Sequence, residues 1–191
     1  MARPPVIAVI GKSLKDPGDP PSPEALRAAE MVGANIAGAG AVLISGGLSG
    51  VMEAASRGAK RANGLVIGML PGFKKDDANQ YVDIALTTGM GWMRNTLVVR
   101  AADAVIMISG GIGTLNELTV AYQDKPTVVL EGTGGWSDRI REIAYDGKHL
   151  DEAHSATLHF ASTPEEAVDL ALALAADPLA YPKGAEKEFT S

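Results

Sequence analysis

Residues 104–117, AVIMISGGIGTLNE, decide the fold, because a buried-strand pattern leads through glycines into a helix. Ala104 to Ile108 is a short, continuous apolar run, as expected for a strand covered on both faces of a sheet. The following residues, Ser109 to Thr114, include three glycines, and a helical pattern begins at about Gly113. A strand, a glycine loop and a helix in this order are typical of a phosphate-binding βα unit.

The same alternation of apolar strands and amphipathic helices extends over the rest of the chain. Ser22-Pro23-Glu24 supplies a cap, a first-turn proline and an acid for a helix, and Thr163-Pro164-Glu165-Glu166 repeats this with capping-box spacing. We expect strands at 6–10, 41–44, 65–70, 82–86, 104–108, 127–130 and 157–160, and helices at 23–38, 49–62, 92–102, 113–123, 136–145 and 164–176.

Short apolar strands that alternate with helices indicate right-handed βαβ units. The sequence therefore predicts an α/β, doubly wound, Rossmann-like three-layer fold with a central parallel sheet and helices on both faces. A length of 191 residues fits one domain. We expect that domain at residues 1–176, followed by a C-terminal tail at 177–191.

Composition excludes several classes of function. The formal net charge of -6 disfavours nucleic acid as a partner, and the absence of cysteine excludes disulfides, thiolate catalysis and iron–sulfur sites. The spacing of His149, His154 and His159 suggests no metal site. Residues 1–5 (MARPP) do not resemble a signal peptide, and no apolar run approaches the ~18 residues of a membrane span. We expect a cytoplasmic protein with no membrane partner and no metal.

In a doubly wound sheet the ligand lies beyond the carboxyl ends of the strands. There, the Ser109–Thr114 loop can offer backbone N–H groups to a phosphate, and Thr114 can add its hydroxyl. Each helix end contributes only ~0.3–1 kcal/mol when exposed, so several converging amides are needed. An alternative from the residues alone is a tight turn in which Thr114 and Glu117 form a capping box.

Two other loops after predicted strands are candidates for the same site. Residues 45–50, SGGLSG, form a second glycine loop, in which Gly46 and Gly47 are candidate ligand-binding residues. Gly11-Lys12-Ser13 resembles the end of a Walker A loop, but Val6 occupies the position of the required glycine. We therefore dismiss a nucleoside triphosphatase motif and keep Ser13 as a candidate ligand-binding residue.

Arg94 precedes the decisive strand, and an arginine fork suits recognition of a phosphate or carboxylate. Arg100 lies about 240° further round a helix at ~100° per residue, so the two arginines cannot share a face. A third glycine stretch, 132–136 (GTGGW), follows a later strand. It would either line the site or anchor a subunit contact through Trp136.

Residues 110–117, GGIGTLNE, match the GGxGTxxE signature of the lonely-guy (LOG) family, long mislabelled as lysine decarboxylases. Residues 45–52 resemble the second glycine loop of that family, and residues 93–103 resemble its arginine-bearing helix. The similarity in order and spacing runs from about Val6 to Leu130. It implies a Rossmann-like fold without dinucleotide chemistry, assembled as a homo-oligomer (a dimer or a dimer of dimers).

The resemblance also implies a reaction, hydrolysis of the N-glycosidic bond of a nucleoside 5′-monophosphate to free base and ribose 5-phosphate, with no cofactor required. Arg94 and Glu117 would be the catalytic pair. A carboxylate can stabilise oxocarbenium character on the ribose while it orients water, and an arginine can fix the ribose or phosphate. The implied phosphate and ligand contacts, together with those from the loops above, are Ser109, Gly110, Gly111, Gly113, Thr114, Gly46, Gly47 and Ser13.

Three positions depart from the pattern of the hydrolases. Ser109 replaces a proline, Asn95 replaces a lysine and Leu97 replaces an acid. With the 132–136 stretch, these changes resemble the branch that includes molybdenum-cofactor carrier proteins. That branch implies an alternative, a non-catalytic carrier or sensor that binds a pterin phosphate such as the molybdenum cofactor.

Two further interpretations are weaker. The loops could form turns only, with no ligand. Lysine decarboxylation would require a pyridoxal cofactor bound through a lysine, and Lys12 alone adjoins these loops. We therefore predict a nucleotide-like ligand or a pterin phosphate, and no lysine decarboxylase.

Overall fold

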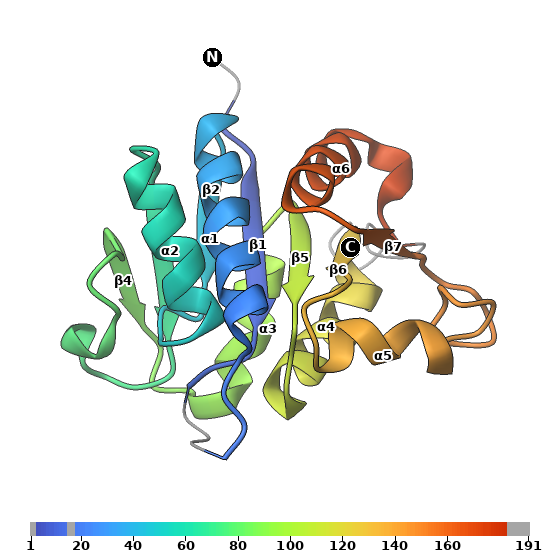
Figure 1. Cartoon of the computed structure of the whole chain (residues 1–191), viewed down its shortest axis with the longest axis horizontal. Coiled ribbons are helices and arrows are strands. Elements are labelled where there is room, and N and C mark those ends of the chain that lie inside the picture. Colours follow the sequence, from blue (N-terminus) through green and yellow to red (C-terminus); the bar gives the residue numbers. More distant parts are fainter. Residues whose placement is uncertain (1–2, 15–17, 183–191) are drawn as a thin grey trace, which may run out of the picture.

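The computed structural model describes residues 3–14 and 18–182, which contain a seven-stranded parallel sheet with helices on both faces (Figure 1). The strands lie in the order β4-β3-β2-β1-β5-β6-β7. Their bounds are β1 Val6–Gly11, β2 Val42–Ser45, β3 Val66–Leu70, β4 Ile84–Thr87, β5 Ala104–Ile108, β6 Thr127–Leu130 and β7 Leu158–Ala161. The α/β Rossmann-like fold predicted from the sequence is confirmed.

Two of the helices begin at the caps that the sequence predicts. The hydroxyl of Ser22 accepts the N–H of Ala25 at the start of α1 (Pro23–Gly38), and Thr163 caps α6 (Pro164–Ala176) in the same way. The remaining helices are α2 Val51–Arg61, α3 Asn95–Arg100, α4 Ile112–Asp124 and α5 Trp136–Ile143, with 3-10 turns at Lys75–Asp77, Gly91–Arg94 and Pro178–Ala180.

The sheet is buried between two apolar cores. Helices α1, α2 and α6, which lie in front of the sheet in Figure 1, share one core with Ile106 of β5. Helices α3, α4 and α5 share the other core with Val105 and Met107 of the same strand. Successive residues of a strand point to opposite faces, so a continuous apolar run fills both cores.

The strand order reverses at the centre of the sheet. From β1 the chain moves to β2 on one side, and after β4 it returns to β5 on the other side of β1. The connection after β1 leads to α1 on one face, whereas the connection after β5 leads to α4 on the opposite face. The two loops therefore diverge, and such a point opens a crevice for a ligand.

The largest difference from the expected elements lies at residues 92–102, which we predicted to form a single helix. The chain instead forms a 3-10 turn, Gly91–Arg94, followed by the short helix α3. Gly89 and Gly91 have φ angles of +66° and +55°, a conformation that favours glycine. The sharp entry they allow places Arg94 at the junction of the two elements.

The C-terminal segment contacts the body of the fold in its described part. The hydroxyl of Tyr181 donates a hydrogen bond of 3.1 Å to the carbonyl oxygen of Asp103. The ammonium of Lys125 lies 5.8 Å from the centre of the Tyr181 ring. Residues 183–191 of the predicted tail lie outside the described residues, and the boundary at 176 stays a prediction. Among the helices of the described ranges, none is long and apolar enough to cross a membrane.

Candidate functional site

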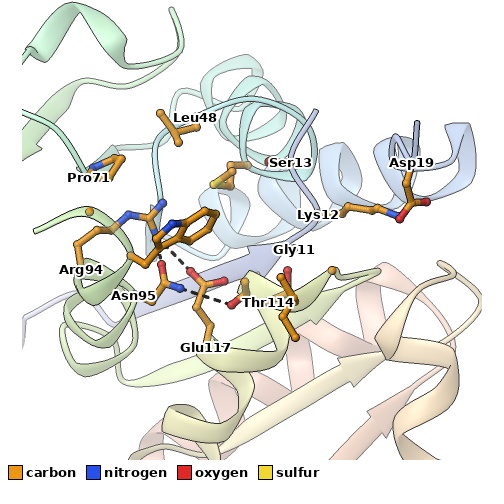
Figure 2. A pocket seen from close by; sticks show the side chains of 16 residues that line it. Gly11, Lys12, Ser13, Asp19, Leu48, Pro71, Arg94, Asn95, Thr114 and Glu117 are labelled. Carbon is orange, nitrogen blue, oxygen red and sulfur yellow. Dashed lines mark hydrogen bonds and ion pairs between the residues drawn. The ribbon is translucent and has the colours of Figure 1, made fainter. Parts of the chain in front are cut away.

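A cavity of about 650 Å³ occupies the crevice between the loops that follow β1 and β5 (Figure 2). It is lined by Gly11–Ser13 after β1, by Gly111–Thr114 at the start of α4, and by the 3-10 turn that carries Arg94. This volume lies in the range of small-molecule sites. The two diverging loops thus leave a space of small-molecule size where the topology predicts a ligand.

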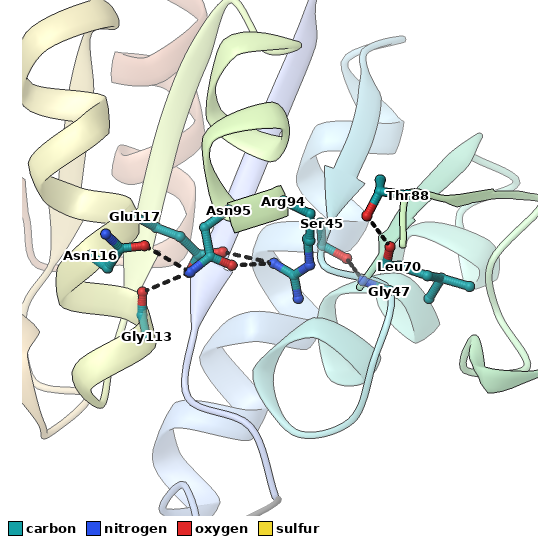
Figure 3. A network of polar contacts seen from close by, with 9 residues as sticks. All are labelled: Ser45, Gly47, Leu70, Thr88, Arg94, Asn95, Gly113, Asn116 and Glu117. Atoms are coloured by element: carbon teal, nitrogen blue, oxygen red, sulfur yellow. Dashed lines mark hydrogen bonds and ion pairs between the residues drawn. The ribbon is translucent and has the colours of Figure 1, made fainter. Parts of the chain in front are cut away.

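Arg94 and Glu117 meet at this cavity although they lie 23 residues apart (Figure 3). Arg94 Nη1 lies 3.3 Å from Glu117 Oε1, and the two residues are only 6% and 7% exposed. Arg94 comes from the 3-10 turn, and Glu117 lies one turn beyond the start of α4. The structure therefore brings the predicted catalytic pair together as a desolvated ion pair, whose disruption would leave an uncompensated charge.

Burial moves both members of the pair toward their neutral forms. It raises the pKa of Glu117 to about 7, although the charge of Arg94 and its hydrogen bond act in the opposite direction. Burial also lowers the pKa of Arg94 from its usual value, against the attraction of Glu117. A carboxyl that is about half ionised at neutral pH suits proton transfer, and such shifts are concentrated at functional sites.

Asn95 and Glu117 both accept a hydrogen bond from Arg94 Nη1. Asn95 Oδ1 accepts a hydrogen bond of 2.7 Å from Arg94 Nη1, and Asn95 Nδ2 donates one of 3.0 Å to Asn116 Oδ1. Asn95 is buried, so its hydrogen bonds, which link the 3-10 turn of Arg94 to α4, are shielded from water. A lysine, which the LOG pattern has at this position, could not accept a hydrogen bond from an arginine.

The predicted phosphate loop turns sharply between β5 and α4. Ser109 and Gly110 have φ angles of +57° and +128°, so the backbone reverses before the helix begins. A Cβ atom built on Gly111 would meet nothing within 4 Å, which shows that this residue faces open space. Gly111 is the N-cap of α4, and the first-turn amides beyond it have no acceptors within the helix. These amides are therefore suited to an anion in the cavity.

Thr114 and Glu117 do not form the capping box that was the alternative for this sequence. Because the N-cap is Gly111, Thr114 lies inside the first turn of α4 and Glu117 faces Arg94. Thr114 is buried and lines the cavity. Ser109 and Gly110 lie just before the lining, whereas Gly111, Gly113 and Thr114 belong to it. Their contact with a phosphate stays a prediction.

The third glycine stretch, residues 132–136, supports the phosphate loop from behind. Thr133 Oγ1 accepts a hydrogen bond of 2.8 Å from the N–H of Ser109. A Cβ atom on Gly135 would lie 2.5 Å from the carbonyl oxygen of Gly110, so the two backbones are in close contact. This brace holds the positive φ angle of Ser109, a conformation that is costly for a residue other than glycine.

The carboxylate of Asp138, in the first turn of α5, accepts hydrogen bonds from amides of the 132–136 stretch. Asp138 accepts hydrogen bonds of 2.7 and 2.8 Å from the N–H groups of Gly132 and Gly134. Trp136, the first residue of α5, is half-buried against the core, and no residue of the stretch lines the cavity. Of the two roles left open by the sequence, lining the site is not observed, because the stretch supports the phosphate loop from outside the cavity. The subunit contact through Trp136 stays a prediction.

In the second glycine loop, Leu48 lines the cavity, whereas Gly46 and Gly47 lie behind Arg94 and do not line it. A Cβ atom on Gly46 would lie 2.4 Å from Arg94 Nη2, and one on Gly47 would lie 2.9 Å from the Cα of Gly68. Figure 3 shows the guanidinium of Arg94 between this loop and Glu117. Both glycines make room for neighbouring groups, and their predicted contact with the ligand stays a prediction.

The loop after β1 brings Ser13 into the cavity lining, together with Lys12. The ammonium of Lys12 forms an ion pair with Asp19 at the rim (Figure 2). The sequence suggested Lys12 only through the dismissed Walker A and decarboxylase interpretations, and it did not mark Asn95 or Trp92 as site residues. The signal in the sequence that could have selected Lys12 for the site is its position directly after a central strand. For Asn95, that signal is the departure from the LOG pattern.

The remaining candidates lie away from the cavity. Arg100 pairs with Asp124 at 2.6 Å and does not line the cavity, whereas Arg94 does. His149 Nδ1 lies 2.6 Å from the carbonyl oxygen of Ala156, and its ring stacks on that of His154. Within residues 3–14 and 18–182, no cluster of three or more His, Cys, Asp or Glu side chains could hold a metal ion.

A glycine-rich helix start at the reversal of a parallel sheet, with an arginine–glutamate pair beside it, defines a Rossmann-like protein of the LOG-related class. Residues 4–168 match the model of the SLOG cluster4 family, and the chain belongs to this family. The resemblance seen in the sequence is thereby confirmed.

Relatives at least 30% identical whose names state a function include two groups. The cytokinin riboside 5′-monophosphate phosphoribohydrolase of Mycobacterium tuberculosis is 33% identical over 142 residues, which cover 66% of this chain and 76% of the relative. The structure of the molybdenum cofactor binding protein from Rippkaea orientalis has a TM-score of 0.76 and 34% identity, over 91% of this chain and 99% of that one. The molybdenum cofactor carrier protein of Chlamydomonas reinhardtii has a TM-score of 0.76 and 30% identity, over 92% and 100% of the two chains.

Proposed function

We propose that this protein is a nucleoside 5′-monophosphate phosphoribohydrolase, which cleaves the N-glycosidic bond and releases a free base and ribose 5-phosphate. The observation that supports this most is the buried Arg94–Glu117 pair, 3.3 Å apart, in the same cavity as the open helix start at Gly111. The relative from Mycobacterium tuberculosis, which is named for this class of reaction, adds support at the level of the family.

The chemistry follows from the charges at the site. The phosphate binds the amides at the start of α4 and the hydroxyl of Thr114, which places the ribose beside Glu117. The bond between C1′ and the base nitrogen breaks, and the ribose gains oxocarbenium character that the ionised Glu117 stabilises. Water oriented by the same carboxylate adds to C1′, and the proton that the water loses balances the one that the leaving base takes up.

Arg94 has two tasks in this mechanism. Its charge holds part of the Glu117 population in the ionised form against the effect of burial, and its guanidinium holds the ribose or phosphate in register with the carboxylate. Gly46 and Asn95 keep the guanidinium in place from behind and from the side. The alignment is set before the ligand enters, which lowers the cost of reaching the reactive geometry.

An end-point chromatography assay with a panel of nucleoside 5′-monophosphates tests this proposal. The protein should release free base, and Glu117→Gln should lower the rate by about 100-fold or more while it retains phosphate binding. Glu131→Gln is the matched control, because Glu131 also pairs with an arginine, Arg141, but lies outside the cavity. Turnover by Glu117→Gln at the native rate would exclude Glu117 as the catalytic carboxylate.

A second candidate function, carriage of a phosphorylated cofactor without turnover, is favoured by Asn95. The shorter hydrogen bond of Arg94 goes to Asn95 (2.7 Å) and not to Glu117 (3.3 Å), so the carboxylate is weakly compensated and about half neutral at pH 7. A neutral carboxyl cannot stabilise an oxocarbenium ion. The structural likeness to the carrier from Chlamydomonas reinhardtii adds support.

The same cavity fits a pterin phosphate as cargo. The open helix start at Gly111 would hold its phosphate, and the volume of about 650 Å³ would accept the fused rings. A panel without free base, in which monophosphates still raise the melting temperature, would exclude the hydrolase and support the carrier. Pterin phosphates would then be the ligands to compare.

A further inference from the structure

Trp92 is the most exposed large side chain of the cavity lining after Ile112. The indole is 74% exposed, in a fold whose two cores bury most of its large apolar groups. It lines the cavity from the 3-10 turn Gly91–Arg94, two residues before Arg94. The side chains of Trp92 and Arg94 therefore project from the same 3-10 turn.

The indole is held against the phosphate loop. A Cβ atom built on Gly113 would lie 3.2 Å from Cζ3 of Trp92 and 3.9 Å from Cε3, so the six-membered ring packs directly on the first turn of α4. Its neighbour Ile112 is 77% exposed and also lines the cavity. Two apolar side chains thus stand at the end of the helix where the phosphate is expected.

The cavity lining combines polar groups, among them Arg94 and Glu117, with apolar side chains, among them Trp92, Ile112 and Leu48. We call these the polar part and the apolar part of the lining. A ligand that joins a phosphate to a flat ring would fill both parts at once. A ligand with the phosphate alone would leave an aromatic face in water, although aromatic faces bind bases well.

We propose that Trp92 is the stacking platform for the heteroaromatic ring of the ligand, a purine or a pterin, and that it determines the preference for ring-bearing phosphates. The proposal rests on the proposed function in one respect, that the phosphate of the ligand binds at the start of α4. Trp92 takes no part in breaking or forming bonds. It contributes affinity and sets the orientation of the ring.

Calorimetric titration of the Glu117→Gln protein, which binds without turnover, measures this contribution. Adenosine 5′-monophosphate (AMP) and ribose 5-phosphate are the two probes, and they differ by the base alone. Trp92→Ala should weaken AMP binding about 5- to 150-fold, the range for loss of one stacked base, and leave ribose 5-phosphate within about twofold. Trp92→Phe should restore most of the loss. Phe73→Ala is the matched control, since Phe73 is 86% exposed but does not line the cavity.

Fluorescence gives an independent readout, because the chain has two tryptophans. In Glu117→Gln with Trp136→Phe added, Trp92 is the sole indole. AMP should quench its emission by stacking, and ribose 5-phosphate should not. Size-exclusion chromatography of Trp92→Ala tests the alternative role of this indole, a contact between copies of the chain.

Three results would overturn the proposal. The first is an equal loss of AMP and ribose 5-phosphate affinity in Trp92→Ala, which would make the indole a support of the phosphate loop. The second is unchanged AMP affinity with an altered oligomeric state, which would assign Trp92 to a subunit interface. The third is a wild-type protein that binds neither probe, which would overturn the proposed function as well, whereas the first two would leave it standing.

Discussion

The glycine loops after β2 and β5 both contain the sequence SGG, at Ser45–Gly47 and Ser109–Gly111, yet they serve the site in different ways. In the first loop, Gly46 lies against the guanidinium of Arg94 and Gly47 against the backbone of Gly68. In the second loop, Gly111 faces open space at the start of α4. Gly46 and Gly47 are therefore required because protein atoms fill the space beside them, whereas Gly111 borders open space at the cavity.

A glycine pattern at the end of a strand therefore does not by itself identify a ligand contact. What distinguishes the loops is the neighbour at each Cβ position, which depends on residues distant in the sequence. Substitution by alanine, which adds only that atom, is therefore the sharpest way to test the comparison.

The largest expected effect is on stability, from Gly47→Ala. Its φ of +70° is unfavourable for alanine by ~1–2 kcal/mol, and the added atom would be forced into backbone at 2.9 Å, which costs a further ~1–3 kcal/mol. Equilibrium urea denaturation should show a loss of about 2–5 kcal/mol in the free energy of unfolding. A loss below about 1 kcal/mol would show that the second loop is not tightly packed.

The next largest effect is the pH dependence of stability that Glu117 produces. Its partner Arg94 lies between the second glycine loop and Glu117. The carboxyl of Glu117 binds a proton more tightly in the folded state (pKa about 7) than in the unfolded state, where the ordinary value is 4.5. The free energy of unfolding should therefore fall as pH rises from about 4.5 to about 7, by up to ~3 kcal/mol from this group.

Denaturation of Glu117→Gln over the same pH range isolates that contribution. The difference in stability between the wild type and the variant should change across pH 4.5–7 and be constant above and below it. The same titration predicts that kcat/KM of the hydrolase rises with pH through an apparent pKa near 7, since the ionised carboxylate is the active form. A flat difference across this window would contradict the burial of an ionisable Glu117.

The brace behind the phosphate loop should have an intermediate effect. Thr133→Val keeps the shape of the side chain but removes the acceptor of the Ser109 N–H, so an unmet buried donor should cost ~1–3 kcal/mol. It should also weaken phosphate binding, measured by calorimetry with AMP. Thr163→Val is the control, because Thr163 caps α6 far from the cavity and should lower stability without altering AMP affinity.

The smallest effect on stability is expected for Gly111→Ala. The backbone of Gly111 has φ of -105°, which alanine adopts without strain, and no atom lies within 4 Å of the new Cβ. Stability should stay within ~0.5 kcal/mol of the wild type. AMP affinity should fall, because the methyl group enters the space for the phosphate. Unchanged affinity would show that the phosphate does not approach Gly111.

The sequence predicts the fold well because its signals are local. Apolar runs such as Ala104–Ile108 match the strands to within a residue or two, and the caps at Ser22 and Thr163 mark helix starts. The error at residues 92–102 arises because two glycines with positive φ, Gly89 and Gly91, break the helical pattern from outside it.

Site residues that belong to a sequence motif were predictable, whereas those that depend on contacts between distant parts of the chain were less so. Arg94 and Glu117 were selected by resemblance to the LOG signature, and the structure places them 3.3 Å apart. The spacing of Thr114 and Glu117 also suggested a local capping box, which a tertiary ion pair displaces. The position of Gly46 behind Arg94 depends on folding and has no signature in the sequence.

A crystal structure of Glu117→Gln with AMP would test most directly whether the loop after β5, and not the loop after β2, holds the phosphate. We expect the phosphate at the start of α4, on the amides around Gly111 and Gly113 and the hydroxyl of Thr114, with the ribose beside residue 117. A phosphate bound instead by the amides of Gly46 and Gly47, with the start of α4 free, would contradict both the assignment of the loops and the mechanism.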